Sequence, residues 1–191
     1  MSENSIAIII DRHLQSWMDK GLNSIVGKTE PEMTGLNEPA SSDGWQKWYP
    51  IDSTVTDSEI EELEKQLTYQ LPASYKAFLK HKHFYELYIS EAQFSGQEIR
   101  MWRRHLIDMA FDGYPREFLF DKGYIPFANW SDWGLLCFDT NQPGVNSEYP
   151  VVLWDHERWN EFKNFSDDFL SMLIKLDIQS GINGSQQGDW Q

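Results

Sequence analysis

The first twenty residues carry apolar side chains at helical spacing. From Ile6 to Trp17 these side chains recur every three or four positions, and Gly21 supplies a stop. The pattern predicts a helix over residues 2–21. Residues 28–44 are instead rich in Pro, Gly, Ser and Asn, a composition that is typical of a loop. The chain is therefore expected to begin with a helix that a loop joins to the rest.

A capping box marks the start of a second helix. The Thr56 hydroxyl can accept a hydrogen bond from the Glu59 amide while the Glu59 carboxylate reaches back, and an apolar stripe follows. Pro72 then takes the first position of a third helix, which is expected to end near residues 81–83. Two amphipathic helices with so short a link predict a helical hairpin. Its expected buried residues are Leu63, Leu71, Tyr75, Phe78 and Leu79.

After the hairpin the apolar pattern changes to one that is mainly typical of strands. It predicts a strand at 84–90, a helix at 97–111, a short strand at 117–120, and three strands at 124–128, 133–139 and 149–155. Turn-forming residues separate the last three strands. Consecutive strands with short links favour an antiparallel meander over crossover units.

A last helix is expected to begin after a cap at Ser166. Its predicted buried side consists of Phe169, Leu170, Leu173, Ile174 and Leu176. The elements together predict an α+β fold, with the helical hairpin and the C-terminal helix packed on an antiparallel sheet and an extra N-terminal helix. We divide the chain into an N-terminal appendage at 1–45, a body at 46–178 and a flexible tail at 179–191.

The net charge narrows the class of partner. The 191 residues include 30 Asp plus Glu against 16 Lys plus Arg, a formal charge of −14. Phosphates would repel such a chain, so we expect no nucleic-acid partner and favour a basic protein. No apolar run is long enough to span a membrane, and the opening residues lack the pattern of a secretory signal. Cys137 is the single cysteine, which suits the cytoplasm.

Candidate catalytic and metal-binding residues are few. His81 and His83 alternate at a helix end with no further ligand near them in the sequence, so a polar helix end is preferred to a metal site. The run at 155–157 (Asp-His-Glu) suggests an acid–base cluster, yet neighbouring residues of a strand point to opposite faces. Cys137 lies in an apolar run, which favours a buried side chain over a nucleophile. We therefore expect no catalytic site, metal or cofactor.

Tryptophan and acid coincide in one part of the sequence. Residues 131–170 hold 8 acids and 2 bases, and Trp130, Trp133, Trp154 and Trp159 lie in or beside them. Tryptophan is enriched at the centres of protein interfaces, because it buries a large area at low entropy cost. We predict a partner-binding surface near the strand ends, made of Trp130, Asp132, Trp133, Asp139, Asp155 and Glu157. Three alternatives remain: tryptophans of the sheet's core and rim, a tryptophan cage for sugars, or an interface on the acidic helix at 57–64.

Several segments together carry a family resemblance. They are TDSEIEELE at 56–64, LPASYKAFL at 71–79, IPFA at 125–128, WGLLCFD at 133–139, PVVLWDH at 150–156 and the closing helix at 166–176. In this order and spacing they resemble the SUKH superfamily, named after the yeast cell-wall-synthesis regulator Smi/Knr. The resemblance covers residues 55–176, and it implies the α+β fold described above.

The resemblance implies one of two roles. In bacteria it implies an immunity protein, which binds a co-encoded toxin domain, often a nuclease, and blocks its active site. In fungi it implies a regulatory interaction module. Neither role requires catalysis. We expect a non-enzymatic inhibitor of a toxin, with a regulatory or scaffolding module as the alternative and an acidic-cleft hydrolase as a third possibility.

Overall fold

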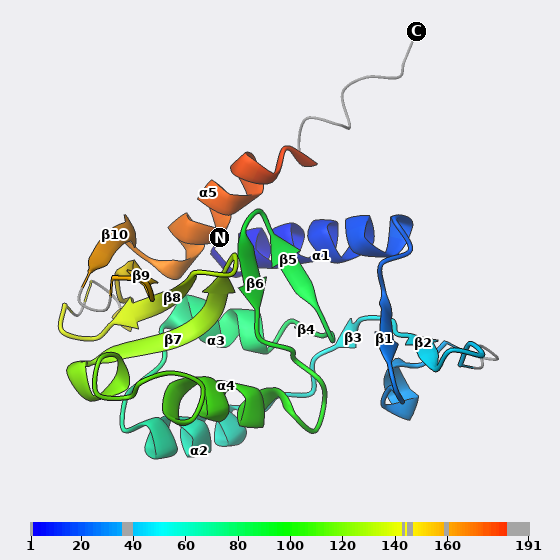
Figure 1. Cartoon of the computed structure of the whole chain (residues 1–191), viewed down its shortest axis with the longest axis horizontal. Helices are drawn as coiled ribbons and strands as arrows, with labels where there is room; N and C mark the ends of the chain where they lie inside the picture. Colours follow the sequence, from blue (N-terminus) through cyan, green and yellow to red (C-terminus); the bar gives the residue numbers. More distant parts are fainter. Residues whose placement is uncertain (1, 36–39, 143, 145–146, 159–160, 183–191) are drawn as a thin grey trace, which may run out of the picture.

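The computed structural model describes residues 2–35, 40–142, 144, 147–158 and 161–182 of the chain. Its helices are α1 (Ser2–Asp19), α2 (Asp57–Leu67), α3 (Ala73–Leu79), α4 (Trp102–Phe111) and α5 (Phe169–Ser180), with 3₁₀ turns η1 (Pro31–Met33) and η2 (Phe120–Lys122). Figure 1 shows these helices arranged around antiparallel strands. The predicted α+β class is confirmed. None of the helices in these ranges has the length and apolar character that a membrane crossing requires.

Six antiparallel strands form the main sheet. In spatial order they are β10 (Phe162–Ser166), β9 (Val151–Asp155), β8 (Gly134–Asp139), β7 (Tyr124–Trp130), β6 (Ala92–Phe94) and β5 (Leu87–Ile89). Each strand pairs with its neighbour in the sequence, so the predicted meander is confirmed. The sequence did not predict β6, which is three residues long, or β10, whose apolar pattern is interrupted by Lys163 and Asn164. Two short pairs lie apart from this sheet: β1 (Ser24–Val26) with β2 (Trp45–Lys47), and β3 (Ile51–Asp52) with β4 (Lys82–His83).

The capping box of α2 is confirmed. The Thr56 hydroxyl accepts a hydrogen bond from the Glu59 amide (3.3 Å), and the Glu59 carboxylate accepts one from the Thr56 amide (2.8 Å). Because these bonds satisfy two otherwise unpaired amides, the helix begins at the residue that the sequence predicts.

The ends of the next two helices differ from the prediction. Helix α3 stops at Leu79, earlier than expected, because β4 follows at once and pairs with β3. The helix predicted from residue 97 begins only at Trp102. The turn before it donates two backbone amides to the Glu30 carboxylate, which lies far away in the sequence.

Three further local predictions are wrong. Residues 117–120 form turns and the start of η2, with no strand. Ser166 ends β10, and the cap of α5 is Asp168, whose carboxylate accepts a hydrogen bond from an amide of the first turn (2.7 Å). Ile174 is exposed, whereas Met172 is buried in its place.

Phe78 lies within an aromatic cluster of the main core. Its ring centroid lies 5.3–6.1 Å from the rings of Tyr75, Phe84, Phe94 and Phe169. All five residues predicted to bury the hairpin are 2% exposed or less. The hairpin prediction is therefore confirmed in its packing as well as in its helices.

The N-terminal helix shares this main core. Ile6, Ile10 and Leu14 are buried in it, and α1 packs on α3 and α5. Asp177 of α5 forms an ion pair with Arg12 (2.7 Å) and a hydrogen bond with His13 (3.0 Å). The predicted division at residue 45 thus does not coincide with a gap between two cores.

A smaller core covers the opposite face of the sheet. It consists of Leu119, Leu135, Cys137, Val152 and Trp154. The Tyr114 ring packs edge-on against Trp154 at 5.9 Å, so the chain that follows α4 closes this face. Trp154 therefore belongs to a core, while Trp159 lies outside the described residues. Most of the predicted tail also lies outside them, and α5 runs past the expected start of that tail at residue 179.

Candidate protein-binding surface

Five of the six residues predicted to bind a partner meet at one end of the sheet. Antiparallel pairing places Gly134, at the start of β8, opposite Asp155, at the end of β9. The Trp133 carbonyl accepts a hydrogen bond from the His156 amide (3.1 Å), which joins the two connections. We call the group formed by Trp130, Asp132, Trp133, Asp155 and Glu157 the strand-end surface.

Asp139 does not belong to this group. It is the last residue of β8, so it lies roughly 17 Å along the strand from Gly134. Its carboxylate is buried and accepts hydrogen bonds from the Asn141 amide (3.1 Å) and the Gln142 side chain (2.8 Å). These bonds give Asp139 a role in holding the turn after β8.

The strand-end surface combines exposed charge with half-buried rings. The side chains of Asp132 and Glu157 are exposed, whereas Asp155 is only 9% exposed and accepts a hydrogen bond from the Glu157 amide (3.0 Å). Trp130 and Trp133 are half-buried and pack against the main core. The surface thus offers two exposed carboxylates beside two large apolar side chains.

Gly134 allows β9 to approach the start of β8 closely, and aromatic contacts hold the neighbouring Trp130. A Cβ atom at Gly134 would lie 2.9 Å from the Trp154 carbonyl oxygen and 3.5 Å from the Cβ of Trp130. The Trp130 ring packs edge-on against Phe165 of β10 at 5.0 Å. On α5, the Lys175 ammonium lies 4.0 Å from the centre of the Phe165 ring. These contacts hold the Trp130 ring in one orientation.

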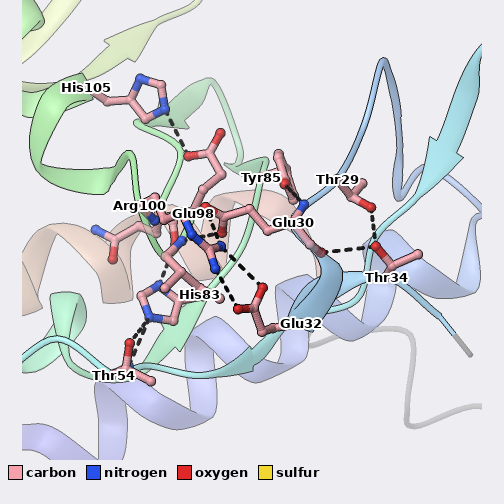
Figure 2. A network of polar contacts seen from close by, with 12 residues as sticks. Thr29, Glu30, Glu32, Thr34, Thr54, His83, Tyr85, Glu98, Arg100 and His105 are labelled. Atoms are coloured by element: carbon pink, nitrogen blue, oxygen red, sulfur yellow. Dashed lines mark hydrogen bonds and ion pairs between the residues drawn. The ribbon is translucent and has the colours of Figure 1, made fainter.

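Two of the residues considered for metal binding or catalysis, His83 and Cys137, have structural roles in the core. His83 is buried, its Nδ1 donates to the Gln97 carbonyl (2.7 Å) and its Nε2 accepts from the Thr54 amide (2.9 Å). Both ring nitrogens are therefore engaged, and Figure 2 shows the Thr54 contact. Burial raises the pKa of the Cys137 thiol, which disfavours the thiolate that a nucleophile needs. Among the described residues, no group of three or more His, Cys, Asp or Glu is placed to hold a metal ion.

A polar network ties the N-terminal segment to the chain before α4. The Glu30 carboxylate accepts hydrogen bonds from the amides of Ile99 (2.7 Å) and Arg100 (3.0 Å). The Arg100 guanidinium pairs with Glu32 (2.7 Å), and the Glu30 amide donates to the Tyr85 hydroxyl. Figure 2 shows these side chains converging from distant parts of the sequence. Sequence reasoning missed them, because nothing local signals a contact across some seventy residues.

A polar groove of about 680 Å³ lies beside this network, between α4 and the strands β6 and β7. Its lining includes Glu86, Gln93, Ser95, His105, Tyr114 and Asn129. Tyr85 and His105 line the groove and also belong to the network, since His105 pairs with Glu98 (2.9 Å). The network therefore supports one wall of the groove.

Two histidines should make opposite contributions to stability as the pH changes. Burial lowers the pKa of His13 from its ordinary 6.5, whereas the Glu98 carboxylate, which accepts from the His105 ring, raises the pKa of His105. The stability that the neutral His13 side chain provides is therefore lost as the pH falls below about 6.5, towards its lowered pKa. The stability that the protonated His105 provides is present below about pH 6.5, and it is lost as the pH rises through the raised pKa of His105.

The measurement is urea unfolding at about pH 5.5 and pH 7.5 for the wild type, His13→Gln and His105→Gln. We expect the stability difference between wild type and His13→Gln to shrink at the lower pH, and that between wild type and His105→Gln to grow. A change of the same sign for both variants would contradict the opposite environments.

A comparison with protein-family models identifies the family of the chain. The family model described as SMI1 / KNR4 family (SUKH-1) matches residues 54–175, well over half of the chain. The chain belongs to this family. No curated protein matches the chain in the corresponding comparison. The predicted SUKH resemblance is confirmed over almost the same residues, and the strand-end surface of this SUKH-1 chain lies wholly inside the matched range.

Proposed function

We propose that this SUKH-1 protein is a non-enzymatic immunity protein, which binds and neutralises a toxin domain in the cytoplasm. The observation that carries the proposal is the strand-end surface, where the exposed Asp132 and Glu157 lie beside the half-buried Trp130 and Trp133. Tryptophan provides a large contact area at the centre of an interface, and charges at its rim guide the approach of a partner. The partner's complementary surface is basic, as on an enzyme that binds phosphates.

The second acidic flank of the chain is a weaker candidate for the interface. Four of the acids on α2 already have partners within the chain: Asp57 with Lys80, Glu59 with Thr56, Glu62 with Arg103 and Glu64 with Lys76. Glu61 is exposed, and no partner contacts it within the described ranges. An acid that already pairs within the chain has less charge to offer to another protein, which supports the strand-end surface.

The proposed interface predicts separate effects on the two rates of binding. Asp132→Asn should slow association and flatten its dependence on salt, because exposed charges act at long range and the Debye length is about 8 Å at 0.15 M salt. Trp133→Ala should mainly speed dissociation and cost about 2 kcal/mol or more of binding free energy. The measurement is binding kinetics at two ionic strengths with the toxin domain encoded beside this chain's gene.

Glu61→Gln is the matched control, because it removes one exposed acid from the other flank. Its kinetics should equal those of the wild type. If Glu61→Gln slows association while Asp132→Asn does not, the interface lies on α2. Association that does not change with salt would exclude electrostatic guidance at either surface.

The alternative is a regulatory or scaffolding module, which the family description SMI1 / KNR4 favours. Co-expression separates the two roles. An immunity protein restores growth of cells that produce the neighbouring toxin domain, whereas a regulatory module does not. Failure of the two purified proteins to form a complex would refute the immunity proposal. Turnover of a substrate by the purified protein would refute the proposal that it is no enzyme.

A further inference from the structure

We propose that the groove between α4 and the strands β6 and β7 binds an arginine side chain of the protein partner, with the Glu86 carboxylate as its counter-ion. This inference rests on the proposed function, because it names a second contact with the same partner. It adds to the strand-end surface a specific pocket with its own ligand chemistry. Asn129 lines the groove and Trp130 follows it in β7, so their side chains point to opposite faces of the sheet and a partner that contacts both would extend around the end of β7.

Glu86 differs from the other carboxylates of the groove. Asp108 pairs with Arg104 (2.6 Å), and Asp112 lies 3.9 Å from the same guanidinium. Glu86 is half-buried, yet no cation or hydrogen-bond donor contacts it among the residues that the structure describes. Burial alone raises its pKa. A partly buried carboxylate without a counter-charge lowers stability, so its presence in the free protein is explained if a cation joins it in a complex.

The remaining lining fits a guanidinium group. Gln93, Ser95 and Asn129 line the groove and carry side-chain oxygens. The Tyr114 hydroxyl donates to the Asn129 oxygen (3.2 Å) and the Asn129 amide donates to the Gln93 oxygen (3.4 Å), and each of these oxygens has a second lone pair for a ligand. The aromatic side chains of Tyr85 and Tyr114 also line it. A guanidinium is planar, carries several donors in a fixed fork and stacks on aromatic faces, so it matches carboxylate, amide oxygens and rings together. An anion would meet the uncompensated charge of Glu86.

The groove is also held in shape before binding. Tyr85 accepts a hydrogen bond from the Glu30 amide, and His105 pairs with Glu98. Figure 2 shows both contacts. A wall that is already ordered need not lose conformational freedom when a ligand enters, so a single side chain can bind measurably.

The first test uses arginine chemistry without the partner. The full chain, labelled with ¹⁵N, is titrated with N-acetyl-argininamide, and N-acetyl-citrullinamide serves as the neutral isostere. We expect saturable shifts of the Gln93 and Asn129 side-chain amides with the arginine compound only. Glu86→Gln should weaken this binding about fivefold or more. Glu117→Gln, which removes an exposed acid outside the groove, should leave it unchanged.

The folded state of the variant is checked separately. Glu86→Gln should unfold about 2–4 °C above the wild type near neutral pH, because the variant no longer buries an uncompensated charge. Absence of shifts at Gln93 and Asn129, equal shifts with the citrulline compound, or unchanged affinity in folded Glu86→Gln would each overturn the proposal.

The second test uses the toxin domain and distinguishes this inference from the proposed function. If Glu86→Gln weakens the complex about fivefold or more while Glu117→Gln does not, the arginine site is supported in its full context. If the complex forms with full affinity in Glu86→Gln, the arginine site is refuted and the immunity proposal stands. If the wild type binds the arginine compound but never the toxin domain, the immunity proposal fails and the site remains for another basic protein.

Discussion

Replacing Phe78 with alanine should lower the free energy of unfolding by about 3–5 kcal/mol. The Phe78 side chain is 2% exposed and contacts four other aromatic rings, which come from α3, α5, β6 and the chain between β4 and β5. Removing the ring forfeits its transfer from water and leaves a cavity that so many rigid neighbours cannot fill. Urea unfolding of the purified variant measures the loss.

The control for Phe78→Ala is Ile178→Ala. Ile178 lies on α5 and is 69% exposed, so truncating it should change stability by less than about 0.5 kcal/mol. A loss below about 1 kcal/mol for Phe78→Ala would mean that the helical hairpin does not pack on the sheet as described.

Asp177→Ala should cost about 3 kcal/mol of stability. The Asp177 side chain is 7% exposed and contacts Arg12 at 2.7 Å and His13 at 3.0 Å. Its removal leaves the Arg12 charge and a buried imidazole without their acceptor, and the loss of one partner of a buried pair is more costly than the loss of the whole pair. The measurement is again the free energy of unfolding.

An exposed ion pair provides the comparison for Asp177→Ala. Arg116 and Asp121 lie 2.7 Å apart, but both side chains are 50% exposed. Asp121→Ala should therefore cost no more than about 1 kcal/mol. Equal losses in Asp177→Ala and Asp121→Ala would show that α1 and α5 are not joined through a buried carboxylate.

Local chemistry explains which parts of the fold could be predicted. The capping box at Thr56 and the three strands of the central meander depend on neighbours within a few residues, so the sequence signals them directly. Helix α1 shows the same periodicity, but its place in the fold depends on Asp177, which lies 164 residues from His13. No pattern in either segment announces that contact, and an apolar stripe does not say what covers it.

In the candidate site, too, the sequence signals local features but not contacts between distant residues. Asp139 and Asp155 each end a strand, and their sequence surroundings give no reason to separate them. The antiparallel pairing of β8 and β9 separates Asp139 from Asp155, because two antiparallel neighbours have their C-terminal residues at opposite ends of the sheet. The Glu86 groove was missed for a related reason: a single carboxylate becomes distinctive only when the fold shows which charges pair and which do not.

Glu30 of the polar network lies outside the residues that the family model matches. Its hydrogen bonds nevertheless hold Tyr85 and the turn at residues 99–100, which lie inside the matched range. The shape of the groove therefore depends on a residue outside the matched range, although every residue that lines the groove lies inside it. A change in the segment around Glu30 would therefore alter one wall of the groove without replacing any residue that lines it. Partner choice can then change through residues that never touch the partner.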